Sequence, residues 1–238
     1  MIFPPFKSDT IYALDLDGVL IDSIEECYQI SILTYHGHED VNKKEKELFF
    51  EYRGLVQPAF EFYYLMSSIK SFLKENNDNV EDIFNNLRQY GRTEKVDHFE
   101  RTFFMNRRNF QKKDFESWIA LNPLTDFGKY VQNKNPDNVF IVTTKNVYSA
   151  KAIIKYYNIY PDMVYGNNTI MEHGSKGLLL NTILLQSKLN KMIFIDDAIE
   201  HLDTVENDNI KCIHATWGYS KIHDNLSYQS INNLKELL

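Results

Sequence analysis

The residues best suited to chemistry are two aspartates, Asp15 and Asp17, which follow the apolar run Ile11–Leu14. Gly18 comes directly after them and allows a tight turn, so both carboxylates can face one site. Two carboxylates this close repel each other, and a bound divalent cation removes the repulsion. Carboxylate oxygens without histidine or cysteine partners favour a hard ion such as Mg²⁺. The pair therefore predicts a magnesium site.

Two later apolar runs also end in polar residues. Val139–Val142 leads into Thr143, and Met192–Ile195 leads into Asp196 and Asp197. Asp197 can supply a third carboxylate to the metal. The hydroxyl and backbone amide of Thr143 can donate to a phosphoryl oxygen.

A lysine completes the set of candidate residues. Lys176 opens a helical pattern after Ser175, and its ammonium can offset the charge gathered between aspartates and a phosphate. Taken singly, Thr143 could be a strand-end cap and Lys176 a surface lysine. Together and in this order they favour a phosphate site, and Thr144 and Lys145 are further candidates for lining it.

Alternating strands and helices must position these residues. Short apolar runs with little alternation are typical of strands buried on both faces of a parallel sheet. Strands are expected at 11–14, 139–142, 163–165, 192–195 and 211–215, and helices at about 148–157, 176–189 and 200–207. This rhythm predicts a doubly wound, Rossmann-like α/β sheet, whose ligands bind at the carboxyl ends of the strands.

The strand signal disappears between residues 23 and 135, where the sequence is aromatic and helical in pattern. Structureless loops of this length are uncommon, which indicates an all-helical domain inserted after the first strand. The predicted domains are an α/β core of residues 1–22 and 136–238 and a helical cap of residues 23–135. The aromatic residues of the insert are interpreted as its core.

Composition limits the partners and the location. The 238 residues carry a net charge of −7, which argues against nucleic-acid binding. No apolar stretch approaches the roughly 20 residues of a membrane span, and the N-terminus lacks a secretory signal pattern. Cys27 and Cys212 are far apart and are expected to be reduced thiols. We therefore expect a cytoplasmic protein, and the choice between a monomer and a homodimer stays open.

These motifs resemble those of the haloacid dehalogenase superfamily, in the phosphatase branch that includes phosphoglycolate phosphatase and β-phosphoglucomutase. The matching segments are Asp15-Leu16-Asp17-Gly18-Val19-Leu20, Ile141-Val142-Thr143, Lys176 and Phe194-Ile195-Asp196-Asp197. The resemblance spans almost the whole chain and implies a helical cap where the insert lies.

The resemblance also implies roles. Asp15 would attack phosphorus, Asp17 would act as acid and base, and Thr143 and Lys176 would hold the phosphoryl group. Its implied Mg²⁺ ligands come from Asp15, the backbone carbonyl of Asp17, Asp197 and the adjacent Asp196. Which residue of the last pair binds directly stays open.

The substrate is predicted only as a small phosphorylated metabolite. Arg53, followed by Gly54, resembles a cap loop that contacts substrate, although it could equally be a surface arginine. His201 stands where many relatives carry an acid, and it is interpreted as a helix-surface residue. Two alternatives stay open: a sugar phosphomutase of the β-phosphoglucomutase type, and a degenerate member that only binds a ligand.

Overall fold

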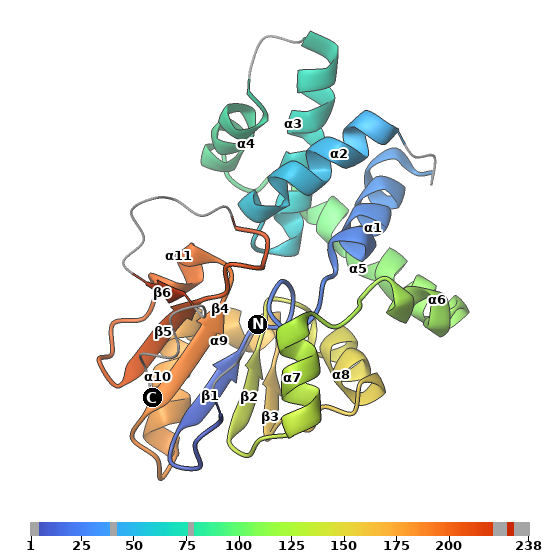
Figure 1. Cartoon of the computed structure of the whole chain (residues 1–238). Helices are drawn as coiled ribbons and strands as arrows, with labels where there is room; N and C mark the ends of the chain where they lie inside the picture. The colour runs from blue at the N-terminus through green and yellow to red at the C-terminus, as the bar shows by residue number, and fades with distance from the viewer. Residues whose placement is uncertain (1–4, 39–41, 76–78, 221–227, 231–238) are drawn as a thin grey trace. The chain divides into compact units, whose positions relative to one another are not determined.

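The chain divides into two compact units. The computed structural model describes residues 5–38, 42–75, 79–220 and 228–230. One unit comprises Met1–Asp22 with Pro123–Leu238, and the other is Ser23–Asn122 (Figure 1). The insert therefore ends after residue 122, whereas the sequence pattern placed its end after residue 135. No helix among the described residues is long and apolar enough to cross a membrane.

The first unit is built on a parallel sheet, as predicted. Its strands are β1 (Ile11–Leu14), β2 (Val139–Val142), β3 (Met163–Tyr165), β4 (Met192–Asp196), β5 (Ile210–His214) and β6 (Gln229–Ser230). They are arranged in the order β3-β2-β1-β4-β5-β6, and every pairing is parallel. The short edge strand β6 was not predicted.

Helices follow the strands of this sheet. They are α7 (Asp126–Lys134), α8 (Val147–Tyr156), α9 (Asn167–His173), α10 (Lys176–Gln186) and α11 (Ile199–Leu202). Residues of α9, α10 and α11 pack on one sheet face, against side chains such as Ala13 and Phe194. On the opposite face Phe6 contacts Tyr12 of β1 and stacks on Tyr130 of α7.

Helix α7 belongs to the sheet unit rather than to the insert. Thr125 caps it by accepting from Gly128 N at 2.9 Å and donates its hydroxyl to Val19 O at 2.7 Å. The helix passes so close to the loop after β1 that a Cβ on Gly128 would lie 2.0 Å from the Leu20 carbonyl oxygen. The helix ends at Lys134, and the residue that follows, Asn135, adopts a left-handed conformation.

The strand order reverses beside β1. From β1 the sheet extends through β2 and β3 on one side and through β4, β5 and β6 on the other. The carboxyl ends of strands at such a switch point form the usual ligand crevice of an open α/β sheet. Asp15 follows β1, Thr143 follows β2 and Asp196 ends β4, so the predicted residues share this edge.

The chain leaves and re-enters the sheet unit at adjacent points. Asp22 N donates to Pro123 O at 2.8 Å. One residue further in on each side, Ile21 and Leu124 form an antiparallel bridge. The insert is thus closed at its base by a short two-stranded pairing within the sheet unit.

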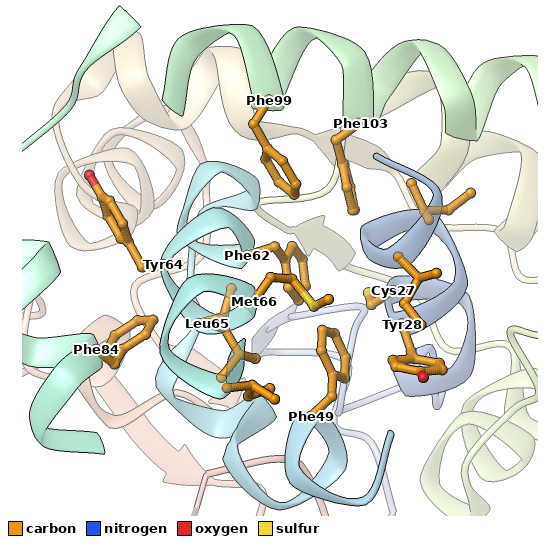
Figure 2. Packing of buried hydrophobic residues seen from close by; sticks show 14 of the residues in the cluster. Cys27, Tyr28, Phe49, Phe62, Tyr64, Leu65, Met66, Phe84, Phe99 and Phe103 are labelled. Carbon is orange, nitrogen blue, oxygen red and sulfur yellow. The ribbon is translucent and has the colours of Figure 1, made fainter. Parts of the chain in front are cut away.

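The second unit is all-helical, as predicted. Its helices are α1 (Ile24–His36), α2 (Lys43–Tyr52), α3 (Phe62–Glu75), α4 (Val80–Gln89), α5 (Glu94–Lys113) and α6 (Phe115–Ala120), with 3₁₀ turns at Arg53–Leu55 and Ala59–Glu61. Its aromatic side chains form the core (Figure 2). Phe62 stacks between Phe49 and Phe103, with ring centroids 5.6 and 5.3 Å away.

A buried ion pair crosses this aromatic core. Arg107 Nε donates to Glu26 Oε1 at 2.6 Å, and Arg107 Nη2 donates to Glu26 Oε2 at 2.8 Å. Trp118 Nε1 also donates to Glu26, at 3.1 Å. Such bidentate pairing in a dry interior costs desolvation but fixes the geometry of the elements that carry it. Arg107 is therefore an internal residue of the insert.

Candidate active site

Three buried carboxylates gather at the switch point. Asp15, Asp196 and Asp197 each offer an oxygen, and these oxygens lie within 4.8 Å of one another. Asp15 and Asp197 are 4 and 5% exposed, and Asp196 is fully buried. Strands β1 and β4 are parallel neighbours, so residues at their carboxyl ends lie close together although they are far apart in the sequence.

Lys176 neutralises part of this charge. It is the first residue of α10, and its Nζ lies 2.7 Å from Asp196 Oδ2 and 3.1 Å from Asp15 Oδ1. Burial alone would lower the pKa of Lys176, but the two carboxylates outweigh it and raise the pKa. The ammonium is therefore a permanent cation between two strand ends.

Asp196 is enclosed by donors. Its Oδ1 accepts from Ala198 N at 2.9 Å, and His201 Nδ1 lies 3.2 Å from Oδ1 and 3.1 Å from Oδ2. Burial would raise the pKa of Asp196, but Lys176 and His201 outweigh it and hold the pKa below its ordinary value. The interpretation of His201 as a helix-surface residue is wrong. The one-turn helix α11 begins so soon after β4 that its third residue turns back onto the strand end.

Asp197 lies between two glycines. A Cβ on Gly18 would stand 2.4 Å from Asp197 Oδ2, and a Cβ on Gly218 would stand 2.2 Å from Asp197 Cβ. Tyr219 N donates to Asp197 Oδ2 at 2.7 Å. Gly18 also has a positive φ of 78°, which a residue with a side chain adopts only under strain. The backbone of Gly18 and Gly218 therefore packs against Asp197, and a side chain at either glycine would displace this carboxylate.

Three other predicted residues of the sheet unit, Asp17, Thr143 and Lys145, are hydrogen-bonded to one another through Lys145. Lys145 Nζ donates to Asp17 Oδ1 at 2.8 Å, and Lys145 N donates to Thr143 Oγ1 at 3.1 Å. Thr143 N donates to Tyr165 O at 3.0 Å, which pins the end of β2 to β3. Thr144 is half-buried beside them. The loops after β1 and β2 are thus joined by the ion pair of Asp17 and Lys145.

The charge balance of the site is negative. Four carboxylates, those of Asp15, Asp17, Asp196 and Asp197, face the ammonium groups of Lys145 and Lys176. Burial raises the pKa of Asp15 to about 6, with Lys176 opposing the rise and Asp196 adding to it. A buried set of oxygen donors with excess negative charge fits a hard divalent cation such as Mg²⁺.

Arg53 lies in the second unit, where it contacts that unit's own residues. Its Nη1 donates to Val56 O at 2.7 Å, and its guanidinium carbon lies 4.9 Å from the centroid of the Phe62 ring. The side chain is buried, with 7% of the residue exposed. Contact between Arg53 and a substrate stays a prediction.

Solved structures share this architecture. No family model and no curated protein matches the chain by sequence. The chain is similar to a haloacid dehalogenase-like family hydrolase from Streptococcus pneumoniae, with 18% identity, a TM-score of 0.59 and 96% of each chain covered. A predicted phosphoglycolate phosphatase from Haemophilus somnus has 12% identity and a TM-score of 0.62, covering 97% of this chain and 98% of its own.

A third similar structure is the HAD-hydrolase YfnB from Bacillus subtilis, described as bound to magnesium. It has 12% identity and a TM-score of 0.57, and the match covers 96% of this chain and 98% of that one. At such identities the likeness concerns the fold. Both the sheet with its reversal beside β1 and the helical insert after that strand are included in these nearly full-length matches. The chain therefore has the fold of the haloacid dehalogenase-like hydrolases.

Proposed function

We propose that this chain is a magnesium-dependent phosphatase that hydrolyses a small phosphate monoester through an aspartyl-phosphate on Asp15. One observation carries the proposal: Asp15 is buried at the switch point with an ammonium 3.1 Å away and two further carboxylates beside it. A carboxylate held next to a fixed cation is suited to attack an anionic phosphorus centre. The similar structures that are described as phosphatases support the same reaction class.

The reaction divides into two displacements. An oxygen of Asp15 forms a bond to phosphorus while the bond from phosphorus to the ester oxygen breaks, and Asp17, which must be protonated at the start of this step, gives its proton to the leaving alcohol. Asp17 then takes a proton from water, whose oxygen attacks the phosphorus of the aspartyl-phosphate. The bond from phosphorus to Asp15 breaks, so that inorganic phosphate leaves and the carboxylate is regenerated.

Mg²⁺ would be held by the carboxylates of Asp15 and Asp197 and by the backbone carbonyl of Asp17. When bound, it would offset the repulsion between the nucleophile and the anionic substrate. Asp196 is less suited to direct binding because both of its oxygens already face donors, Lys176, Ala198 N and His201. Its proposed task is to hold Lys176.

The loop after β2 would receive the phosphoryl group. Thr143 follows β2, the strand next to β1. Lys176 lies 3.1 Å from Asp15, and Lys145 adds a cation beside Asp17. Thr144 is proposed to line the same edge. A net charge of −7 over the whole chain favours a small phosphorylated metabolite over a nucleic acid.

A screen of phosphorylated metabolites with Mg²⁺ tests the proposal. Wild type is expected to release phosphate from at least one class of monoester, while Asp15→Asn folds normally by circular dichroism and releases none. Phosphate release by Asp15→Asn at near wild-type rates would show that the nucleophile is wrong. Slow hydrolysis together with turnover that depends on a sugar bisphosphate would instead identify a phosphomutase.

A further inference from the structure

We infer that His201 is a positioning residue of this site, which acts by donating from Nδ1 to Asp196 and so holds Lys176 against Asp15. The inference rests on the proposed phosphatase function. No hydrogen bond or ion pair joins His201 to Asp15 directly, so the positioning effect would pass through two intermediate side chains. These contacts form the chain His201, Asp196, Lys176, Asp15.

The geometry fixes which ring nitrogen carries a proton. His201 Nδ1 lies 3.2 Å from Asp196 Oδ1 and 3.1 Å from Oδ2. Asp196 is fully buried between Lys176 and Ala198 N, both of which donate to it, and its oxygens act as acceptors. The group facing it must therefore donate, which assigns the hydrogen to Nδ1.

Each oxygen of Asp196 consequently faces two donor groups. Oδ1 faces Ala198 N and His201, and Oδ2 faces Lys176 and His201. This arrangement leaves the carboxylate one orientation, which sets the place of the Lys176 ammonium. Residues that orient groups at a metal or reacting centre commonly affect affinity or rate by about 10- to 100-fold.

The backbone around His201 is itself anchored. Thr204 donates its hydroxyl to His201 O at 2.7 Å, and Leu202 next to it is fully buried. The His201 side chain is only 14% exposed. The ring therefore faces Asp196 because the turn holds it there. An acid at this position could not donate and would add a like charge beside Asp196.

The role of His201 can be tested by replacing it with two residues of nearly the same shape, asparagine and aspartate. Asparagine places an amide N–H where the Nδ1–H stands, whereas aspartate has the same shape without a donor. His201→Asn is expected to rescue turnover to within about threefold of wild type, while His201→Asp and His201→Leu lower kcat by about 10- to 100-fold with little change in KM. Glu200→Gln, an exposed change in the same helix, is the control. Equal kcat for His201→Asn and His201→Asp would overturn the inference.

A second measurement needs neither substrate nor metal. Nitrogen-15 NMR of the imidazole rings in the metal-free protein is expected to show Nδ1 of His201 protonated, with the signal identified by its loss in His201→Asn. A neutral ring protonated on Nε2 alone would overturn the inference even if the protein is a phosphatase. If wild type hydrolyses no phosphate ester, the proposed function fails, and this spectrum still decides whether His201 donates to Asp196.

Discussion

Lys145 donates to Asp17 at 2.8 Å and so joins the loop after β2 to the loop after β1. The Lys145 side chain is 1% exposed and that of Asp17 is 15% exposed, so the pair is shielded from water on the lysine side. In the proposed mechanism Asp17 is the acid and base. Its partner therefore fixes where the proton is delivered.

Replacing Lys145 with methionine should separate these two loops. We expect kcat/KM to fall by about 10- to 100-fold, and the free energy of unfolding to fall by about 1–3 kcal/mol because a charge-assisted hydrogen bond is lost. Steady-state kinetics and urea unfolding measure the two effects. Lys151→Met, at an exposed position of α8, is the matched control. Unchanged kinetics in Lys145→Met would mean that the pair has no part in turnover.

Ionisation of Asp15 should lower the free energy of unfolding of the metal-free protein. Its pKa is raised from 3.8 to about 6, mainly by burial, so the folded state binds the proton more tightly than the unfolded state does. Stability contributed by this group is therefore present below about pH 4 and is lost as the pH rises through 6. At pH 8 the free energy of unfolding of Asp15→Asn should exceed that of wild type by on the order of 1–3 kcal/mol.

Urea unfolding in EDTA from pH 4 to pH 8 measures this difference. The advantage of Asp15→Asn should shrink as the pH falls toward 4, where wild-type Asp15 becomes protonated. Asp208→Asn, an exposed change on the same unit, is the control. A constant difference between Asp15→Asn and wild type across this range would contradict the raised pKa.

Added Mg²⁺ should stabilise the protein through Asp197. At a free concentration of about 100 times its dissociation constant, Mg²⁺ should add about 2.7 kcal/mol to wild type. Asp197→Asn should lose most of this gain, because Asp197 is one of three clustered carboxylates. Thermal unfolding with Mg²⁺ or EDTA measures it, with Glu200→Gln as the control. An undiminished gain in Asp197→Asn would exclude Asp197 as a ligand.

We expect Gly18 to affect Mg²⁺ binding as well as the backbone turn. Gly18 and Gly37 have nearly equal φ values of 78° and 77°, but a Cβ on Gly18 meets Asp197 whereas one on Gly37 meets nothing within 4 Å. Both alanine variants should lose about 1 kcal/mol from backbone strain. Only Gly18→Ala should also weaken Mg²⁺ binding, by displacing Asp197. Calorimetric titration with Mg²⁺ compares them, and equal affinities would refute the close packing.

Local sequence was sufficient to predict strands β1, β2 and β4 and the edge of the sheet at which they end. The runs at 11–14, 139–142 and 192–195 are apolar throughout, which is typical of strands buried on both faces, and they are strands in the structure. Parallel order then brings the residues after them to one edge. Asp15, Asp196 and Asp197 do cluster there.

Pairings between distant residues could not be predicted in this way. The contact of Lys145 with Asp17 links loops 128 residues apart, and no local pattern encodes it. The assignment of α7 to the insert failed because its sequence is largely polar, while its place depends on the capping by Thr125 and the close approach at Gly128. The sequence does not reveal that His201 faces Asp196, because a helix of a single turn has no periodicity from which to infer its buried side.

The paired base of the insert has an evolutionary consequence. Asp22 and Pro123 are hydrogen-bonded neighbours in the sheet unit, so the intervening Ser23–Asn122 is tethered at what is nearly a single point. The closure entropy of such a tether grows only slowly with the number of residues inserted. Segments of different length and sequence can therefore be exchanged at this junction without a change in the strand order or pairing of the sheet. The clustered carboxylates of the sheet unit and the inserted unit between Asp22 and Pro123 are therefore free to diverge at different rates.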